Sequence, residues 1–442
     1  MNTPSAVAEF ARKRAFITSA QVVDAFGVSP ASAVRLIGDA GEALLRLGAA
    51  RATRYVATRD VRGFGRHWPI YLVDEAGRLA TAGTLHALHG DRWFVDAASP
   101  WQSLLQTGSD RGIFDGLPWY LDAMRPQGFM GRAYALHCAH LLGGLPSDTQ
   151  AWGDDDTLVG AIIAGDDISG NFLLGEPPAV RFGLYRPRIH TPWNDRASAY
   201  MAAAQRALEG EPVGSSAAGE QPKFGMALTM PDGSPQHMLV KFSPPTDTPS
   251  GQRWSDLLVC EHLANTCLRA AGMVTADTSI VQAGDRTFLE SVRFDRVGER
   301  GRRALTSLFP LATSLGCAST RWSDAADLLL AEQLLDEVTH QRMVALQRFG
   351  NLIGNSDMHL GNLSLWLGQR APFALAPLYD MLPMVYRPTS QGEIIDRGFR
   401  PAPDGHHWTI DAARAFWTAV ASNDMVSESF RAIASGHVRA FN

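Results

Sequence analysis

Two carboxylates and one amide in the last third of the chain have the types and the order of a phosphoryl-transfer site. Asp357 and Asn362 show the D-x-x-x-x-N spacing of a kinase catalytic loop, and Asp380 follows where a strand is expected to end. The first carboxylate can accept a proton from an attacking hydroxyl group, whereas an amide oxygen and a second carboxylate are hard ligands that suit Mg²⁺. The spacing alone occurs by chance in many proteins, so the prediction depends on residues further upstream.

A lysine and a glutamate that could serve the same reaction lie upstream. Lys241 belongs to residues 237–242, which have a strand pattern, and Glu261 belongs to residues 257–271, which have the periodicity of an amphipathic helix. In kinases a strand lysine pairs with the phosphates of ATP and a helical glutamate orients it. We therefore expect Glu261 to contact Lys241, although an isolated pair of this kind is more often a solvated lysine and a solvated glutamate.

A run of small residues precedes the lysine strand. Residues 214–224 read Gly-Ser-Ser-Ala-Ala-Gly-Glu-Gln-Pro-Lys-Phe, and small side chains let backbone N–H groups surround phosphate oxygens. The run is neither a Walker A sequence nor G-x-G-x-x-G, and by itself it would be read as a surface turn. The loop, the lysine, the catalytic-loop spacing and Asp380, taken in this order, predict a phosphotransferase that uses a nucleotide.

Four segments then resemble a known family. Residues 219–223, 292–296, 353–359 and 375–380 are similar to motifs of the HipA family, which are serine/threonine kinase toxins of bacterial toxin–antitoxin systems. The resemblance covers roughly residues 176–390, with weaker similarity before it. It implies a two-lobed fold like that of protein kinases, an activity that uses ATP and Mg²⁺, and a protein substrate, which by family analogy would belong to the tRNA-charging machinery.

The resemblance also assigns roles to individual residues. It implies that Asp357 is the catalytic base with His359 close to the nucleotide, and that Asn362 and Asp380 hold Mg²⁺. The residues that it places on ATP are Gly219, Gln221, Lys223 and Lys241, with a hinge at Val292–Phe294 around the adenine.

Members of the family regulate themselves by phosphorylating a serine in this loop. The register on Gly219 and Gln221 places that serine at Ser216, with Ser215 beside it. Phosphorylation would add about two negative charges next to the nucleotide. The sequence departs from the family at Pro222, where a glutamate is usual, and the fixed φ of proline changes how the loop closes.

The N-terminal residues predict a small basic domain. Residues 1–66 carry ten Lys and Arg against five Asp and Glu, although the whole chain has a formal net charge of −5. Helical patterns over 4–14 and 19–26, a third helix that runs from Pro30 through Leu47, and a strand over 51–58 predict a winged helix-turn-helix. Ser32 and Arg35 would then lie near DNA bases and Arg51 and Arg54 near phosphates, while a three-helix packing domain without DNA is the alternative.

These observations give the expected organisation. We expect an α/β (α+β) chain with a winged helix-turn-helix over 1–62, an N-terminal lobe over 66–292 and a largely helical catalytic lobe over 293–442. Strand patterns occur at 69–74 and 92–96, and residues 152–174 have a helical pattern.

Composition limits the possible location and partners. No run of 18 apolar residues predicts a membrane span, the first 20 residues lack a secretory signal, and four cysteines without a C-x-x-C motif suit the cytoplasm. Typical HipA proteins bind DNA through a separate antitoxin, and a head fused in cis leaves the need for that partner open. The alternative function is a DNA-binding repressor or DNA-cleaving toxin with a kinase-like, nucleotide-sensing body.

Overall fold

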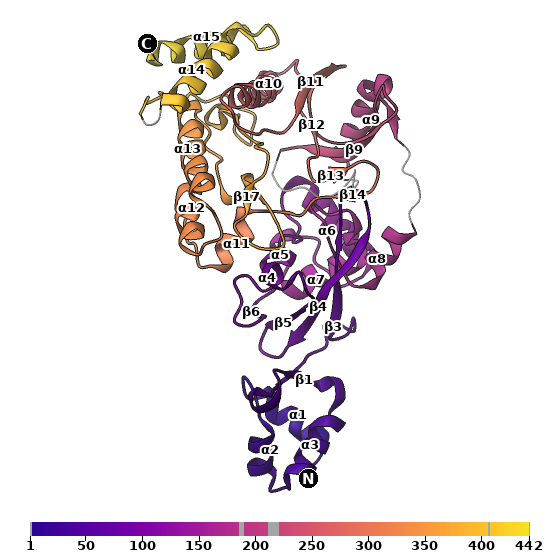
Figure 1. Cartoon of the computed structure of the whole chain (residues 1–442). Helices are drawn as coiled ribbons and strands as arrows, with labels where there is room; N and C mark the ends of the chain where they lie inside the picture. The colour runs from indigo at the N-terminus through magenta and orange to yellow at the C-terminus, as the bar shows by residue number, and fades with distance from the viewer. Residues whose placement is uncertain (1, 185–189, 211–220, 405–406, 442) are drawn as a thin grey trace.

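The computed structural model describes residues 2–184, 190–210, 221–404 and 407–441. Figure 1 shows a small N-terminal head joined to a much larger body, which contains two five-stranded sheets, two smaller sheets and a layer of helices. The mixed α and β composition that the sequence predicts is present. Within the described residues, no helix is both long enough and apolar enough to cross a bilayer.

The head consists of three helices and a two-stranded antiparallel sheet. Its core contains Val7, Val22 and Ile37, and its elements are α1 (Pro4–Arg12), α2 (Ser19–Phe26), α3 (Pro30–Asp39), β1 (Leu44–Leu47) and β2 (Arg54–Ala57). Ser29 caps α3, since its hydroxyl accepts the Ser32 N–H at 3.2 Å.

The expected continuation of the third helix through Leu47 is wrong. Helix α3 ends at Asp39, Gly41 follows with a φ of +54°, and Leu44 then pairs with Ala57 across the β1–β2 sheet. The spacing of apolar residues cannot distinguish one continuous helix from a helix and a strand that are separated by a turn. The glycine permits this turn because it adopts positive φ without steric cost.

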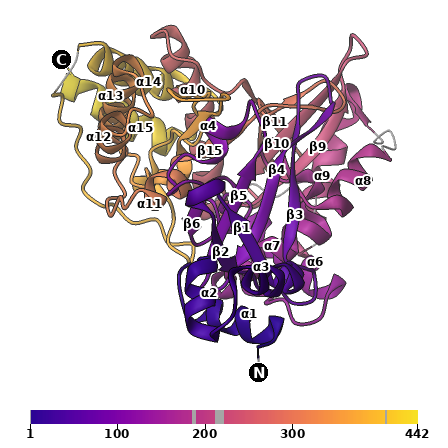
Figure 2. The same ribbon diagram turned by 60° about the horizontal axis from the view of Figure 1, so that its bottom comes forward.

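The head is joined directly to the body without a long linker. Arg59 donates two hydrogen bonds of 2.7 and 2.8 Å to Asp155, and its backbone N–H donates to Ala87 O at 3.0 Å. Arg62 lies 2.6 Å from Asp156. Part of the predicted basic excess is therefore used in the joint. Figure 2 shows the head at one end of the first sheet.

The first sheet forms the part of the body next to the head. Its strands follow the order β6-β5-β4-β3-β7, and all neighbours are antiparallel. They are β3 (His67–Val73), β4 (Leu79–Leu88), β5 (Arg92–Ala97), β6 (Ile113–Asp115) and β7 (Phe172–Leu174). The helices around it are α4 (Gln102–Leu105), α5 (Trp119–Asp122), α6 (Gly128–Leu141), α7 (Asp154–Ala164) and α8 (Glu176–Gly183). The helical expectation for 152–174 is wrong after Ala164, since Phe172–Leu174 pairs with β3.

The second sheet has the order β11-β12-β10-β9-β8 and is antiparallel except for the short β8–β9 pair. Its strands are β8 (Thr191–Pro192), β9 (Lys223–Thr229), β10 (Pro235–Phe242), β11 (Thr278–Ala283) and β12 (Arg286–Val292). Helix α9 (Arg196–Leu208) covers one face and shares a separate apolar core with the sheet through Tyr200, Phe224 and Phe288. Helix α10 (Pro249–Ala270) contacts strands β10, β11 and β12.

The C-terminal part is mostly helical. Its helices are α11 (Leu308–Ser314), α12 (Trp322–Ala331), α13 (Glu337–Ile353), α14 (His407–Ser422) and α15 (Glu428–Val438), and its short strands are β13 (Arg296–Val297), β14 (Gly301–Arg302), β15 (Leu305–Ser307), β16 (Ser364–Trp366) and β17 (Ala374–Leu375). One apolar core extends from Val61 to Phe441 and joins these helices to the first sheet and to α10. This core holds the C-terminal helices, the first sheet and α10 together.

Candidate functional site

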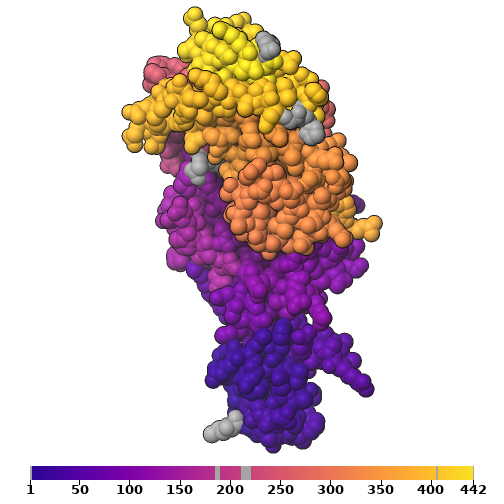
Figure 3. All heavy atoms as spheres, turned by 90° about the vertical axis from the view of Figure 1, so that its left-hand side faces the viewer, coloured from indigo at the N-terminus to yellow at the C-terminus, as the bar shows by residue number. Residues whose placement is uncertain are grey.

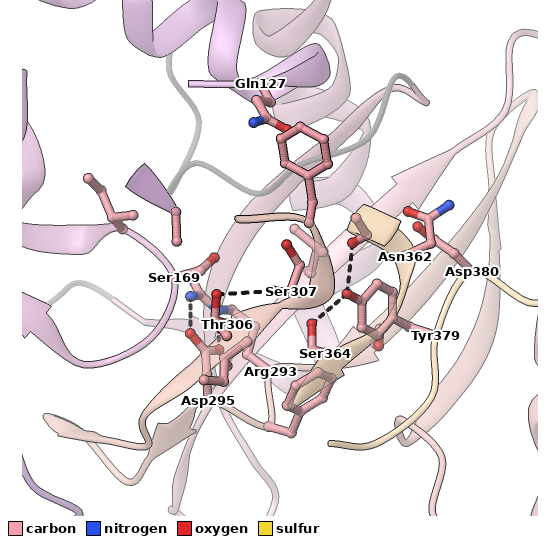
Figure 4. Close-up of a pocket in the computed structure, with 18 of the residues that line it drawn as sticks. Gln127, Ser169, Arg293, Asp295, Thr306, Ser307, Asn362, Ser364, Tyr379 and Asp380 are labelled. Atoms are coloured by element: carbon pink, nitrogen blue, oxygen red, sulfur yellow. Dashed lines mark hydrogen bonds and ion pairs between the residues drawn. The ribbon is translucent and has the colours of Figure 1, made fainter. Parts of the chain in front are cut away.

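A pocket opens between the second sheet and the C-terminal part of the body. Its walls come from β10, from the end of β12, from the segment between α5 and α6, and from the loops around Gly361 and Tyr379. Of the residues that the sequence placed in the nucleotide site, six line this pocket: Lys223, Lys241, Val292, Phe294, Asn362 and Asp380. Figure 4 shows Asn362 and Asp380 side by side, with Arg293 and Asp295 in another part of the pocket.

Lys241 is held between two carboxylates. It points from β10 toward α10, where its Nζ lies 2.7 and 2.6 Å from the two carboxylate oxygens of Glu261. The same ammonium group is ion-paired with Asp380, whose backbone N–H donates to Glu261 Oε1 at 3.1 Å. All three groups are buried or nearly buried. The predicted contact between Glu261 and Lys241 is therefore present, and Asp380 is a second carboxylate paired with the same ammonium group.

The electrostatics of this cluster follow from burial and pairing. Burial opposes the charge of Lys241, but the carboxylates of Asp380 and Glu261 outweigh it and raise the pKa of Lys241 above its ordinary value. Burial raises the pKa of Glu261. Burial also acts to raise the pKa of Asp380, yet Lys241 and Lys223 outweigh it and lower that pKa overall. The lysine is thus protonated at neutral pH, and Asp380 is ionised.

The loop after α13 carries Asp357 and is fixed by a buried amide. The helix ends at Gly354, whose φ of +75° turns the chain toward the pocket. Asn355 Oδ1 accepts the Asp357 N–H at 3.1 Å, and Asn355 Nδ2 donates to Asp380 O at 3.1 Å. One side chain therefore positions the backbone of both acidic residues. The side chain of Asp357 itself is exposed.

His359 and Asn362 extend the same loop. The Asn362 amide donates from Nδ2 to Asp357 O at 2.9 Å, and the His359 N–H donates to the same carbonyl at 3.0 Å. His359 is exposed and close enough to Asp380 to contribute to lowering its pKa. Asp357 and His359 thus lie immediately beside the residues that line the pocket.

The donor set fits Mg²⁺. Since Asn362 uses Nδ2 in its bond to Asp357 O, its Oδ1 is the atom left to act as a ligand. Asp380 supplies a carboxylate beside it in the same pocket. Among the described residues there is no cluster of three His, Cys, Asp or Glu side chains suited to a metal ion. A site with one carboxylate and one amide is typical of Mg²⁺, which keeps several waters and binds phosphate oxygens.

Val292 and Phe294 contribute apolar side chains to the pocket wall. Val292 is the last residue of β12, and the Phe294 ring packs against Tyr379 and Trp366. The Tyr379 hydroxyl lies 2.7 Å from Ser364 Oγ and donates to the backbone at 3.1 Å. The side chains of Val292 and Phe294 provide apolar surface for the face of a flat ring.

A buried charge cluster attaches the segment that follows β12 to the loop that precedes β7. Asp295 accepts bonds from Arg293 at 2.7 Å and Arg296 at 2.6 Å and from the Gly170 N–H at 3.0 Å. Burial opposes its charge, but the two guanidinium groups hold the pKa of Asp295 well below its ordinary range. The segment that follows β12 is therefore fixed on both sides of Phe294.

Sequence reasoning did not identify two groups of functional neighbours. Asn355 lies within the family-like segment 353–359, and Arg293 and Asp295 lie within the segment 292–296, but none was singled out. Their position within segments that resemble family motifs was the feature of the sequence that could have identified them. Nothing in the local sequence shows that residues 122–127 line the same pocket, because that contact is purely tertiary.

Some of the remaining predicted residues lie outside the described part of the chain, and the others lie inside it. Gly219, Ser215 and Ser216 lie outside the described residues. Gln221 is described, and its Nε2 is buried without a hydrogen-bond partner among the described residues. Lys223 is buried on β9 directly opposite Lys241 in the sheet register.

The predicted DNA-contacting residues differ in their surroundings. Arg35 and Arg51 are exposed. The Arg54 guanidinium lies 4.8 Å from the centre of the Phe16 ring, and the Ser32 hydroxyl accepts a bond of 3.0 Å from Ser29.

The fold and the pocket define a HipA-like protein, and comparisons with known proteins agree. Residues 215–440 match the family described as HipA-like C-terminal domain, and residues 64–183 match the YjjJ-like toxin, middle domain. Toxin YjjJ of Escherichia coli (strain K12) is 38% identical to this chain over 421 residues, which cover 92% of this chain and 90% of that protein. The chain therefore belongs to the HipA family, among its YjjJ-like toxins, and the resemblance inferred from the motifs is confirmed.

A solved structure shows the same fold. A chain in the complex of HipA, HipB and its operator DNA from a Shewanella oneidensis MR-1 toxin–antitoxin system has a TM-score of 0.51. It is 17% identical and matches 85% of this chain and 95% of its own length. At this identity, the match establishes the fold alone. The proinflammatory kinase CtkA of Helicobacter pylori matches with a TM-score of 0.34, which is too low to carry an argument.

Proposed function

We propose that this HipA-like toxin is an ATP- and Mg²⁺-dependent protein serine/threonine kinase. The observation that carries the proposal is the position of Lys241 between Glu261 and Asp380, beside Asn362 in one pocket. A lysine on a strand, a glutamate on the following helix and a later aspartate form the phosphate-binding arrangement of kinases. A metal-dependent nuclease would need the carboxylate and the amide but not the lysine–glutamate pair.

The chain's own residues would perform the following tasks. The exposed carboxylate of Asp357 would receive the proton of a substrate serine or threonine hydroxyl as that oxygen attacks phosphorus. Asn355 keeps Asp357 at a fixed place relative to Asp380. Lys241 and Lys223 would offset negative charge on the transferred phosphoryl group and its neighbours.

Mg²⁺ and ATP would bind in the same pocket. Asn362 Oδ1 and the Asp380 carboxylate would hold Mg²⁺, which when bound neutralises phosphate charge. The adenine would lie beside Val292 and Phe294, with Gly219 and Gln221 on the phosphates. Ser216, or Ser215 next to it, would receive the regulatory phosphate.

Autophosphorylation tests the proposal directly. The full chain, first shown by mass spectrometry to be unphosphorylated, is incubated with labelled ATP and Mg²⁺. Asp357→Asn serves as the test variant, and Asp424→Asn, at a fully exposed carboxylate far along the chain, is the matched control. We expect label on Ser216 or Ser215 in wild type and in the control but not in Asp357→Asn. Equal labelling of all three proteins, or no labelling of any, would overturn the kinase assignment.

ATP binding separates this proposal from the nuclease and repressor alternatives. Since a ligand that binds only the folded state raises its stability, ATP with Mg²⁺ should raise the melting temperature. A nuclease that uses only the metal would be stabilised by Mg²⁺ alone and would show no added effect of ATP.

We also propose that the head is a winged helix-turn-helix that binds DNA. The supporting observation is that the head projects from the body, as Figure 3 shows, and exposes Arg35 on α3 and Arg51 before β2. The related HipA was solved in a complex with HipB and operator DNA, and here the fused head would take over the contact with DNA. The protein substrate, and any separate antitoxin, would then be recognised by the body.

Salt-dependent DNA binding tests this second proposal. Arg35→Ala should weaken binding of duplex DNA by the full chain, because base and phosphate contacts depend on this side chain. Arg12→Ala is the matched control, since Arg12 is also exposed in the head but pairs with Glu9. Binding that is equally affected by both changes, or absent in wild type, would contradict the assignment.

A further inference from the structure

We propose that a second cavity, which shares no lining residue with the nucleotide pocket, binds a small monocarboxylate with an aliphatic tail. The cavity lies between the start of α10, helix α15 and the segment that follows Tyr386. Its walls combine charged groups with branched aliphatic side chains. The residues on which the argument rests are Arg253, Arg400, Asp396, Ile394, Ile395 and Ile433.

Arg253 is a buried cation whose guanidinium lies 4.7 Å from the centre of the Phe430 ring but leaves hydrogen-bond donors unused. The residue is 7% exposed, yet its guanidinium makes only one hydrogen bond in the described part of the chain, a long one of 3.4 Å from Nη1 to Tyr386 O. Its Nε has no hydrogen-bond partner among the described residues. A buried guanidinium with unused donors is costly unless an acceptor is supplied. Since Arg253 lines the cavity, an anion bound there would supply that acceptor.

The nearest carboxylate does not fill this role. Asp256 Oδ2 lies 3.9 Å from Arg253 Nε, beyond hydrogen-bond distance. The Asp256 oxygens instead accept the Ser427 N–H at 2.8 Å and the Ser427 hydroxyl at 2.6 Å, and Gln252 donates to one of them at 3.3 Å. These bonds fix the beginning of α15, so Asp256 is already used as a cap.

The charges around the cavity limit the charge that a ligand can carry. Arg253 and Arg400 contribute two positive charges, and Asp396 and Asp256, which lies 3.9 Å from Arg253, contribute two negative charges. His437 is neutral at pH 7, because burial and Arg400 lower its pKa to about 4. Since these charges balance, a singly charged carboxylate adds less repulsion beside Asp256 and Asp396 than a phosphate ester, which would carry about two negative charges.

The aliphatic walls specify the rest of the ligand. Ile394 and Ile395 are 41% and 44% exposed, and Ile433 is partly buried beside them. Three branched side chains around one opening leave apolar surface that a hydrocarbon tail can cover. Each buried CH₂ group contributes roughly 0.8 kcal/mol of transfer free energy, so affinity should rise with tail length.

The cavity wall is connected to the catalytic loop, although the binding proposal does not depend on kinase activity. Arg387, next to Tyr386, donates to Ser356 Oγ at 3.1 Å, and the Val385 N–H donates to Gly354 O at 2.9 Å. An occupant of the cavity would therefore contact the segment that also holds the residues before Asp357.

Isothermal titration of the full chain tests the inference, with sodium octanoate as the probe at constant ionic strength. Octanoate should bind to one site, and both acetate and 1-octanol should bind at least about tenfold more weakly, because each lacks either the tail or the charge. Arg400→Gln, at an exposed side chain, should weaken octanoate about tenfold, and Arg253→Met should weaken it further. Arg431→Gln, on the same helix α15 but outside the cavity, is the matched control and should bind as wild type does.

Several results would overturn the inference. They are octanoate binding that Arg400→Gln does not reduce, equal binding of octanoate and octanol, and no heat of binding up to the solubility of the probe. If Arg253→Met fails to fold, Arg400→Gln and the comparison of the three probes still decide the question.

Discussion

Replacing Glu261 with glutamine tests whether the buried lysine cluster serves catalysis or only stability. In the folded protein the Glu261 carboxylate accepts two short bonds from Lys241 and one from the Asp380 N–H. Glutamine keeps the shape and one acceptor, but it directs an NH₂ group at an ammonium ion. Lys241 would keep only Asp380 as a charged partner, and its position would change.

The magnitude follows from these contacts. Hydrogen bonds to charged groups contribute about 1.5–3 kcal/mol each, and loss of the repulsion between the two carboxylates offsets part of that, so we expect Glu261→Gln to cost about 2 kcal/mol of unfolding free energy. Removing one preorganised group from the site of a developing charge lowers rates by about 10²–10³-fold. We therefore expect autophosphorylation to fall at least about 100-fold.

Glu290→Gln is the matched control. Glu290 is equally buried, on β12 in the same sheet, and it accepts a bond of 2.7 Å from the Tyr200 hydroxyl and one of 3.3 Å from Arg196. Its replacement should cost similar stability without touching the pocket. The assays are urea unfolding for stability and the initial rate of label incorporation for activity. Equal loss of rate in both variants, or a normal rate in Glu261→Gln, would refute the assignment of Lys241 to the phosphates.

Three further predictions concern the rest of the molecule. Burial and the neighbouring Arg400 guanidinium lower the pKa of His437 to about 4, so below pH 6.5 the unfolded chain binds more protons than the folded chain. The free energy of unfolding should therefore fall by on the order of 2 kcal/mol between pH 6.5 and pH 4. The fall should be smaller in His437→Gln, as measured by urea unfolding midpoints at a series of pH values. Arg59→Gln removes the paired bond to Asp155 and should increase hydrogen exchange of the amides that join head to body, with unchanged exchange in α14 as the internal control. Gly301→Ala should destabilise the protein by more than about 1 kcal/mol, because the new Cβ would lie 2.0 Å from the Glu75 carbonyl oxygen. Gly38→Ala, in an open helical position, should instead stabilise it by about 0.5–1 kcal/mol. Melting curves measure both effects.

The parts of the fold that could be predicted are those specified by local pattern. The strand over 237–242 and the helix that carries Glu261 were predicted, and β10 and α10 are found there, because period and capping depend on neighbouring residues. Residues 79–88 were not predicted as a strand, since their mixed small and apolar residues have no clear alternation. Leu44 was assigned to a helix because spacing alone cannot show that Gly41 turns the chain.

In the candidate site, too, the features given by local sequence could be predicted and the tertiary contacts could not. The kinase order of Lys241, Asp357, Asn362 and Asp380 could be seen in the sequence because it is a linear motif, and their grouping around one pocket accords with it. The anchoring of Asp295 by Gly170 and the wall from residues 122–127 could not be predicted, because these contacts join segments far apart in the chain. The basic excess of the head was also misleading in part, since Arg59 and Arg62 pair with carboxylates of the body.

The direct joint between head and body has a geometric consequence for the proposed function. Because Arg59 and Arg62 attach the head to α7 of the body, a head bound to DNA would hold the pocket around Lys241 at one orientation relative to the double helix. Two copies bound to a palindromic site would be related by its two-fold axis. The direction in which the two pockets face would then be determined by the spacing of the half-sites, and changing that spacing by a few base pairs would rotate one pocket around the DNA relative to the other.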